Sequence, residues 1–201
     1  MENDILSLDY EESIRLRQSH ISGACQLHFG DTPVRIVRSQ GQFLFDDAGE
    51  KYLDFGSRIT NVGHCHPRVV AAGCAQMEML TVTEYSGQND LQEQYTRALL
   101  ATLPPNFEVC LFTSSGAEAN DIALQLAKLY TGKKGIVAVE NAFHGAVSSL
   151  IDISPKAFKR IISGKKPWVH VVPLPDMYRG RHAAEIDAAQ KYFNDAKDVI
   201  D

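Results

Sequence analysis

Residues 114–117, with the sequence Ser-Ser-Gly-Ala, combine two hydroxyl groups and a glycine at a predicted junction between a strand and a helix. The preceding residues 109–113 are apolar and β-prone, which predicts a strand buried on both faces. The helix that follows has an apolar face at i, i+4, i+7 and i+8, made by Ile122, Leu126, Leu129 and Tyr130. A helix N-terminus offers unpaired N–H groups and the positive end of a dipole, so this turn could bind phosphate.

The same turn has a simpler interpretation. Ser115 to Glu118 form the pattern S-x-x-E, a capping box that many helices carry without binding a ligand. No lysine of the G-K-[ST] type and no G-x-G-x-x-G pattern accompanies the glycine, which argues against nucleoside triphosphates and dinucleotides.

A second stretch strengthens the case for a phosphate site. Residues 135–139 (GIVAV) predict another short buried strand, which leads into residues 140–145 (ENAFHG). Two successive strand–helix units would place both turns side by side at one edge of a sheet, next to Phe143 and His144. A flat aromatic ring beside a phosphate site suggests a planar phosphorylated cofactor. Without the motif, Phe143 would be interpreted as a core aromatic and His144 as a hydrogen-bonded loop histidine.

The order of motifs SSGAEAN and NAFHG, with GHCHP upstream, resembles the class III aminotransferases, which are pyridoxal-phosphate (PLP) enzymes of fold type I. The resemblance runs from about residue 15 to about residue 182. Within the family, SSLIDISP, WVHVVPLPD and YRG are most similar to the alanine–glyoxylate-aminotransferase-2-like subgroup, which includes the ethanolamine-phosphate phospho-lyases.

The resemblance implies an α/β fold with two parts. Residues 1–60 would supply an N-terminal helix and a small antiparallel β segment of the small domain. Residues 61–201 would form an incomplete PLP-binding large domain, with a mostly parallel sheet and flanking helices. The chain is therefore expected to be an N-terminal fragment of a longer enzyme. The helix predicted near its end lacks a C-cap glycine or a returning strand, which agrees with this expectation.

The resemblance also assigns the site residues. The cofactor-binding residues it implies are Ser115, Gly116 and Ala117 for the phosphate, Phe143 for stacking on the ring, and His144 for shaping the pocket. Candidate substrate residues are Arg58, Tyr85 and Arg179, and the simpler interpretation of the two arginines is surface charge. No catalytic residue is assigned, because the family's Schiff-base lysine segment and ring-nitrogen carboxylate do not occur in this chain.

The reaction stays open between two alternatives that the resemblance implies. One is a transaminase acting on an amine or amino acid. The other is a phospho-lyase that releases phosphate and ammonia from a phosphorylated amine such as phosphoethanolamine. Loop 56–62 lacks the paired asparagines of the phospho-lyases, and Phe143 stands in place of a tyrosine. These differences weaken the inference about the substrate more than the inference about the cofactor. A contrasting hypothesis is an inert truncated product that at most pairs with a full-length partner. A third is a phosphosugar- or nucleotide-binding α/β domain, which leaves NAFHG unexplained.

Composition sets broader limits. The chain has 201 residues, 44% of them hydrophobic, and a net charge of −5, which does not suggest nucleic acid or an anionic membrane as a partner. Four cysteines without a C-x-x-C pair are typical of reduced intracellular thiols. We expect an intracellular protein of the mitochondrial matrix or cytoplasm, with a homodimer for the full-length enzyme implied by the resemblance. The cluster 64–66 (His-Cys-His) is interpreted as a structural loop, and no metal site is predicted.

The remaining elements follow from periodicity and from turn residues. Helices are predicted at 10–19, 67–80 and 91–103, two or three antiparallel strands within 34–55, and a strand at 168–172. A basic loop is predicted at 156–167, and residues 146–153 could be helical or extended. A last helix is predicted from residue 183, with its apolar face made by Ile186, Ala189, Phe193 and Ile200.

Overall fold

The computed structural model describes residues 8–25, 27, 33–82, 90–160 and 164–201. Contacts divide the chain into two compact units, Met1–Asp90 and Leu91–Asp201. The predicted domain boundary after residue 60 stays a prediction.

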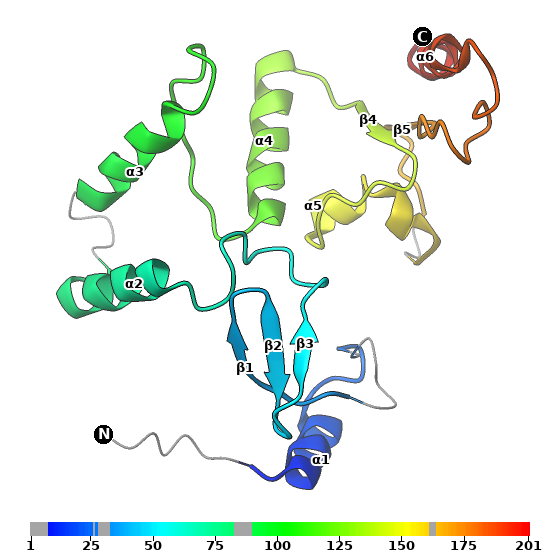
Figure 1. The fold of residues 1–201 in the computed structure, drawn as a ribbon. Coiled ribbons are helices and arrows are strands. Elements are labelled where there is room, and N and C mark those ends of the chain that lie inside the picture. The colour runs from blue at the N-terminus through cyan, green and yellow to red at the C-terminus, as the bar shows by residue number, and fades with distance from the viewer. Residues whose placement is uncertain (1–7, 26, 28–32, 83–89, 161–163) are drawn as a thin grey trace. The chain divides into compact units, whose positions relative to one another are not determined.

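The first unit contains a three-stranded antiparallel sheet, coloured blue to cyan in Figure 1, in the order β1-β2-β3. Its strands are β1 (Ile36–Gln40), β2 (Phe43–Asp46) and β3 (Lys51–Leu53). Gly41 has φ +55° in the tight turn between β1 and β2, a conformation that favours glycine. The antiparallel strands predicted within residues 34–55 are therefore confirmed.

Two helices of this unit also agree with the prediction. Helix α1 (Tyr10–His20) begins after Asp9, whose carboxylate accepts a hydrogen bond from Glu12 N at 2.8 Å. Helix α2 (Pro67–Met79) has proline in its first turn, where its missing N–H costs no hydrogen bond. Among its described residues, this unit has no fully buried side chain.

The second unit contains a parallel pair of strands, β4 (Ile136–Val139) and β5 (Val169–Val172), paired with Ile136 opposite Val169. Its core consists of Ala138, Leu150, Ile153 and Val169. Only one face of β4 is covered, since Val137 is 49% exposed whereas Ala138 is 4% exposed. The prediction of a buried strand at residues 135–139 therefore holds for one face only, and the strand itself is confirmed within a parallel pair.

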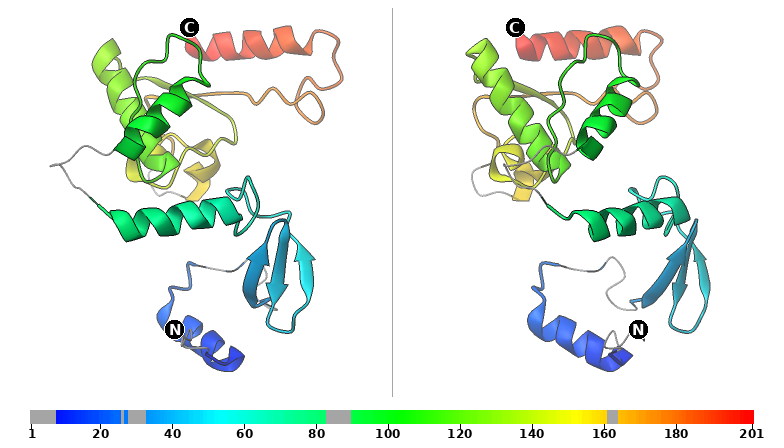
Figure 2. Two further views of the ribbon diagram at one scale, coloured as in Figure 1. Left: turned by 60° about the vertical axis from the view of Figure 1, so that its left-hand side comes forward. Right: turned by 90° about the vertical axis from the view of Figure 1, so that its left-hand side faces the viewer.

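The helices of this unit are α3 (Asp90–Leu100), α4 (Gly116–Thr131), α5 (Ser148–Ile151) and α6 (Ala188–Ile200), with a 3₁₀ helix η1 (Pro155–Arg160). Helix α4 contacts α5, and the two lie next to each other in both views of Figure 2. Helix α6 contacts β5. Helix α3 ends three residues earlier than predicted. Helix α5 decides the open question at residues 146–153, and η1 corrects the prediction that residues 156–160 form a loop. None of the helices in the described ranges is long and apolar enough to cross a membrane.

The strand predicted at residues 109–113 is absent from this part of the structure. These residues have no strand assignment, and Val109 and Leu111 are 83% and 65% exposed. An extended segment becomes a strand only when a neighbouring strand accepts its hydrogen bonds, and no described segment pairs with this one. The apolar, β-prone composition was identified correctly, but composition does not supply the partner.

The buried faces of α4 and α6 also differ from those predicted. On α4, Leu129 and Tyr130 are 83% and 93% exposed, and the helix instead packs on the core through Ala117 and Leu124. Helix α6 begins at Ala188 rather than at residue 183, and buries Ala188 and Tyr192. The residues predicted for its buried face are exposed in three cases: Ile186, Phe193 and Ile200. A helix with two apolar stripes can bury only the one that its tertiary neighbour covers.

Candidate cofactor site

The N-terminus of α4 is built by a reciprocal cap. Ser115 has extended backbone angles and its Oγ accepts a hydrogen bond from Glu118 N at 3.2 Å. The Glu118 carboxylate in turn accepts one from Ser114 N at 2.8 Å. The serine half of the predicted capping box is confirmed, whereas Glu118 accepts from the N–H one residue before the N-cap; both bonds fix the direction in which the chain enters the helix.

Two N–H groups remain open at this helix end. Within the described part of the chain, no acceptor meets the N–H of Gly116 or of Ala117. A Cβ added at Gly116 would find no atom within 4 Å, so the approach to this residue is clear. Two unpaired donors at the positive end of a helix of 16 residues can bind an anionic group.

The turn at residues 140–145 lies directly against this helix end. Asn120 of α4 donates a hydrogen bond from Nδ2 to the carbonyl of His144 at 2.9 Å. Gly145 has φ +142°, and a Cβ added there would lie 2.8 Å from Ala117 Cβ and 2.7 Å from Leu150 Cδ1. Only glycine therefore permits this approach. The fold thus brings the backbone of the second predicted turn next to the first.

Phe143 and His144 differ in their surroundings. Phe143 is 56% exposed, so much of its ring surface is available for contact with a ligand. His144 is half-buried, and its backbone N–H donates to Ser154 Oγ at 3.0 Å. The assignment of cofactor-binding roles to both residues stays a prediction.

A cavity of about 790 Å³ lies in the first unit, and one of about 620 Å³ adjoins α4 in the second. The cavity at α4 is lined by Phe112, Thr113, Ser114, Glu118, Asp121, Ile122, Val147, Ser148 and Ser149. Ser149 Oγ donates to the Asp121 carboxylate, and this bond, with a second from Gln125, lowers the pKa of Asp121. The five predicted cofactor residues do not line this cavity, which begins at the neighbouring Ser114.

The structure describes two of the three predicted substrate residues, Arg58 and Arg179. Arg58 is exposed in the first unit, in a loop held by Asp54, and Tyr85 lies outside the described residues. In the second unit, the Arg179 guanidinium lies 5.5 Å from the centre of the Tyr178 ring. Its backbone N–H donates to Asp176 Oδ1 at 2.9 Å, and this bond, with that from Tyr178 N, lowers the pKa of Asp176. The structure therefore shows Arg179 as a residue of a local turn.

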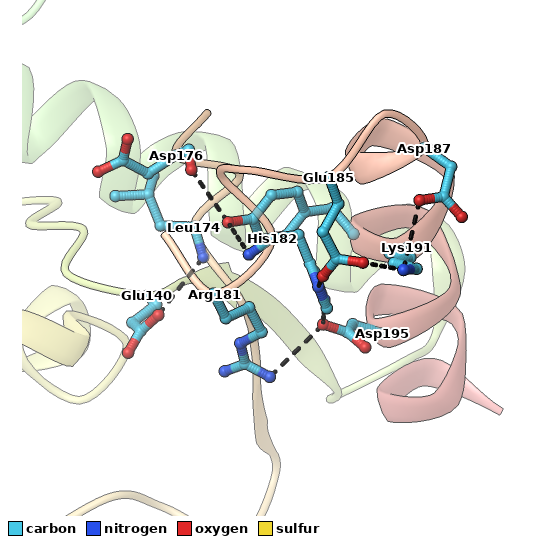
Figure 3. Close-up of polar contacts among 10 residues, drawn as sticks. Glu140, Leu174, Asp176, Arg181, His182, Glu185, Asp187, Lys191 and Asp195 are labelled. Atoms are coloured by element: carbon cyan, nitrogen blue, oxygen red, sulfur yellow. Dashed lines mark hydrogen bonds and ion pairs between the residues drawn. The ribbon is translucent and has the colours of Figure 1, made fainter. Parts of the chain in front are cut away.

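A neighbouring arginine lies closer to the carboxyl end of β5. Arg181 forms an ion pair with Asp195 of α6 at 3.4 Å, as Figure 3 shows, and lines a cavity of about 290 Å³ that Glu140 also lines. His182 contacts the same carboxylate of Asp195 at 3.0 Å and Glu185 at 2.9 Å. These polar contacts connect residues 181–185, which precede α6, to Asp195 on the helix.

The lysines and His64 are the remaining side chains that could take part in chemistry. Among those whose surroundings the structure describes, no lysine is buried: Lys128 lies 5.4 Å from the Trp168 ring and Lys166 pairs with Asp152 at 3.5 Å. His64 Nε2 contacts Asp54 at 2.6 Å. The described residues contain no group of three or more His, Cys, Asp and Glu side chains that could hold a metal ion.

Two residues near the turn were missed by the sequence analysis. Asn120 belongs to the SSGAEAN motif, and its position one turn after the cap was an available signal. Ser154 is fully buried and hydrogen-bonds to the turn, but nothing in its local sequence distinguishes it from a surface serine.

The chain belongs to the class III aminotransferases, since the family described as aminotransferase class-III matches residues 27–201. A Drosophila melanogaster relative, alanine–glyoxylate aminotransferase 2-like, is 41% identical over 175 residues, which cover 87% of this chain and 35% of the relative. The resemblance noted from the motifs is confirmed.

Solved structures agree with this assignment. A phospholyase from Arthrobacter in complex with phosphoethanolamine matches with a TM-score of 0.78 and 27% identity, covering 92% of this chain and 43% of that one. A taurine:2-oxoglutarate aminotransferase from Bifidobacterium kashiwanohense, in complex with PLP and glutamate, matches with a TM-score of 0.82 and 22% identity, covering 95% and 44%. This chain thus spans between about one third and one half of the length of these proteins.

Proposed function

We propose that this chain supplies the phosphate-binding and ring-stacking part of a PLP-dependent enzyme of the aminotransferase family. The observation that carries the proposal is the unpaired pair of N–H groups at Gly116 and Ala117, with the turn of Phe143 fixed beside them by the hydrogen bond from Asn120 to His144. These residues fit the phosphate and ring of PLP in chemical type. Family membership supports the choice of this cofactor over other planar phosphates.

Each part of the site has a distinct task. The helix N-terminus would hold the phosphate through Gly116 and Ala117, with the Ser115 hydroxyl able to donate a third hydrogen bond. Phe143 would lie against the ring and exclude water from one of its faces. When bound, PLP supplies a ring that withdraws electrons and so stabilises negative charge on the carbon next to an amine. No lysine of this chain is assigned to hold the cofactor covalently.

The decisive experiment uses two substitutions at Gly116. Gly116→Pro removes one N–H donor at the first helical position, where proline is tolerated, and the extended Ser115 before it is compatible with proline. Gly116→Ala is the matched control, because it keeps the N–H and its Cβ meets no atom within 4 Å. Loss of one charge-assisted hydrogen bond predicts a roughly 10- to 100-fold weaker affinity for PLP in the proline variant.

The measurement is equilibrium binding of PLP and of inorganic phosphate by calorimetry, with circular dichroism confirming that each variant folds. Equal affinities of the proline and alanine variants would contradict the proposed phosphate site. Reduction of the PLP complex with borohydride, followed by mass spectrometry, tests the covalent assignment separately. A pyridoxyl adduct on a lysine within residues 1–201 would show that this assignment is wrong.

The reaction of the whole enzyme is proposed as either amino-group transfer or phospho-lyase chemistry. Similarity to a phospholyase solved with phosphoethanolamine supports the second, and similarity to the alanine–glyoxylate aminotransferase 2-like relative supports the first. We propose a small amine or amino acid as substrate and a homodimer as the complete enzyme. Incubation of the full-length enzyme with phosphoethanolamine distinguishes the two reactions, because only a phospho-lyase releases inorganic phosphate without an amino acceptor.

The contrasting proposal is that this chain is inert and at most pairs with a full-length partner. It predicts that the isolated chain binds neither PLP nor phosphate with measurable affinity. Size-exclusion chromatography of the chain mixed with a full-length relative then shows whether it pairs.

A further inference from the structure

The backbone of His144 is held from both sides, by the side chain of Asn120 on α4 and by that of Ser154 in the link between α5 and η1. Its carbonyl accepts from Asn120 Nδ2 at 2.9 Å, and its N–H donates to Ser154 Oγ at 3.0 Å. Because Phe143 immediately precedes His144, fixing the peptide groups of His144 also restricts the direction in which the Phe143 ring leaves the chain.

Ser154 is itself fixed. It is 0% exposed, and its hydroxyl donates to the carbonyl of Leu150 at 2.6 Å, so its proton is engaged and a lone pair faces His144 N. The next segment adds a third tie, since Lys156 N donates to the carbonyl of Ala142 at 3.1 Å. The peptide groups on both sides of Phe143 are therefore held, although the Phe143 side chain is 56% exposed.

A turn fixed so thoroughly beneath an exposed ring suggests that the orientation of the ring matters. We propose that Asn120 and Ser154 are positioning residues that orient Phe143 for stacking on the ring of a planar, phosphorylated ligand. This inference rests on the proposed function, because it presupposes that phosphate is bound at Gly116 and Ala117. It adds that the ring contribution to affinity depends on two residues that do not touch the ligand.

The test compares two probes, inorganic phosphate and 4-deoxypyridoxine 5′-phosphate, which has the cofactor's ring and phosphate but no aldehyde. Their affinity ratio in the same protein measures the ring contribution. Asn120→Ala is the main variant, because Asn120 is exposed and its replacement leaves the core untouched. Gln125→Ala is the matched control: it removes another amide from the same helix, whose partner is Asp121 rather than the turn.

We expect Asn120→Ala to lower the affinity ratio about threefold to tenfold, the size of an aromatic stacking contribution, and to leave phosphate affinity unchanged. Ser154→Ala should do the same, and Gln125→Ala should change neither quantity. In a Phe143→Ala background, Asn120→Ala should have no further effect on the ratio, because the ring that it positions is absent. A purely structural role would instead lower both affinities together.

The failures of the two proposals are distinguishable. Absence of phosphate and analogue binding in the unmodified chain overturns the proposed function and this inference with it. If both probes bind but Asn120→Ala keeps the original ratio, the proposed function stands and the positioning role is wrong. Ser154 is buried, so a Ser154→Ala protein that fails to fold leaves the decision to the exposed Asn120 variant.

Discussion

The loop of residues 54–64 in the first unit and the turn of residues 140–145 in the second are each held by a polar side chain, but the two differ in charge. Asp54 accepts hydrogen bonds from Gly56 N at 2.8 Å, Ser57 N at 2.9 Å and His64 Nε2 at 2.6 Å. The pKa of Asp54 is held well below its ordinary value, first by a hydrogen bond from the Ser57 side chain, then by the bond from His64, and then by the two backbone bonds. In the second unit, the neutral hydroxyl of Ser154 holds the turn by accepting a hydrogen bond from His144 N.

The difference follows from the surroundings of each loop. The Asp54 side chain is only 7% exposed, and the hydrogen bonds from Gly56 N, Ser57 N and His64 replace the hydration that its carboxylate loses. Ser154 lies against Leu150 and Ile153 of the core, where an ion would lose its hydration without recovering it. A neutral hydroxyl with two hydrogen bonds is the group that such a site can accommodate. The comparison predicts that the first loop depends on pH and the second on packing.

The largest effect is expected where packing holds the turn. In Gly145→Ala, the new Cβ would lie 2.7 Å from Leu150 Cδ1 and 2.8 Å from Ala117 Cβ, at φ +142°. We expect the free energy of unfolding of the second unit to fall by about 2–3 kcal/mol, from the clash and the backbone strain together. Gly132→Ala is the control, because it has φ +66° but no atom within 4 Å of its Cβ, and should cost about 1 kcal/mol. Urea unfolding with hydrogen exchange resolved by peptide measures both, and equal losses would mean that the contact with Ala117 and Leu150 is not formed.

A smaller effect is expected where charge holds the loop. The folded-state pKa of Asp54 is depressed, so its stabilisation is present above the ordinary pKa of about 3.9 and is lost as the pH falls below it. Asp54→Asn should remove this dependence of loop stability on pH. At neutral pH it should destabilise the loop by less than Gly145→Ala destabilises the second unit. Hydrogen exchange of residues 54–64 between pH 2 and pH 6, corrected for intrinsic rates, compares the variant with the unmodified chain. A parallel acid-dependent loss in both proteins would exclude Asp54 as the charged anchor.

The smallest effect is expected for a charged anchor that remains open to solvent. Asp195 contacts Arg181 and His182 (Figure 3). Its side chain is 29% exposed. Asp195→Asn should lower the free energy of unfolding by about 0.5–1 kcal/mol, and added salt should reduce the difference. Asp198→Asn on the same helix is the control, since no ion pair of Asp198 occurs within the described ranges, and should have almost no effect. A loss as large as that of Gly145→Ala would show that the network of α6 is organised like the core.

Local sequence determined the features that depend on neighbours along the chain. The hairpin around Gly41, the proline at the start of α2 and the Ser115–Glu118 cap were predicted because each is decided within about five residues. The motifs around residues 114–117 and 140–145 also identified the family correctly. The cofactor roles of Ser115, Gly116, Ala117, Phe143 and His144 remain predictions that follow from those motifs.

Only the tertiary structure decided which apolar surface is buried and which polar groups meet. Residues 109–113 have the composition of a strand, but strand formation needs hydrogen bonds from a partner that local sequence does not provide. Helix α4 has more than one apolar stripe, and its contact with the core selects Ala117 and Leu124 rather than Leu129 and Tyr130. The bonds from Asn120 and to Ser154 join residues 24 and 10 positions apart from His144, and such pairings exist only once the chain has folded.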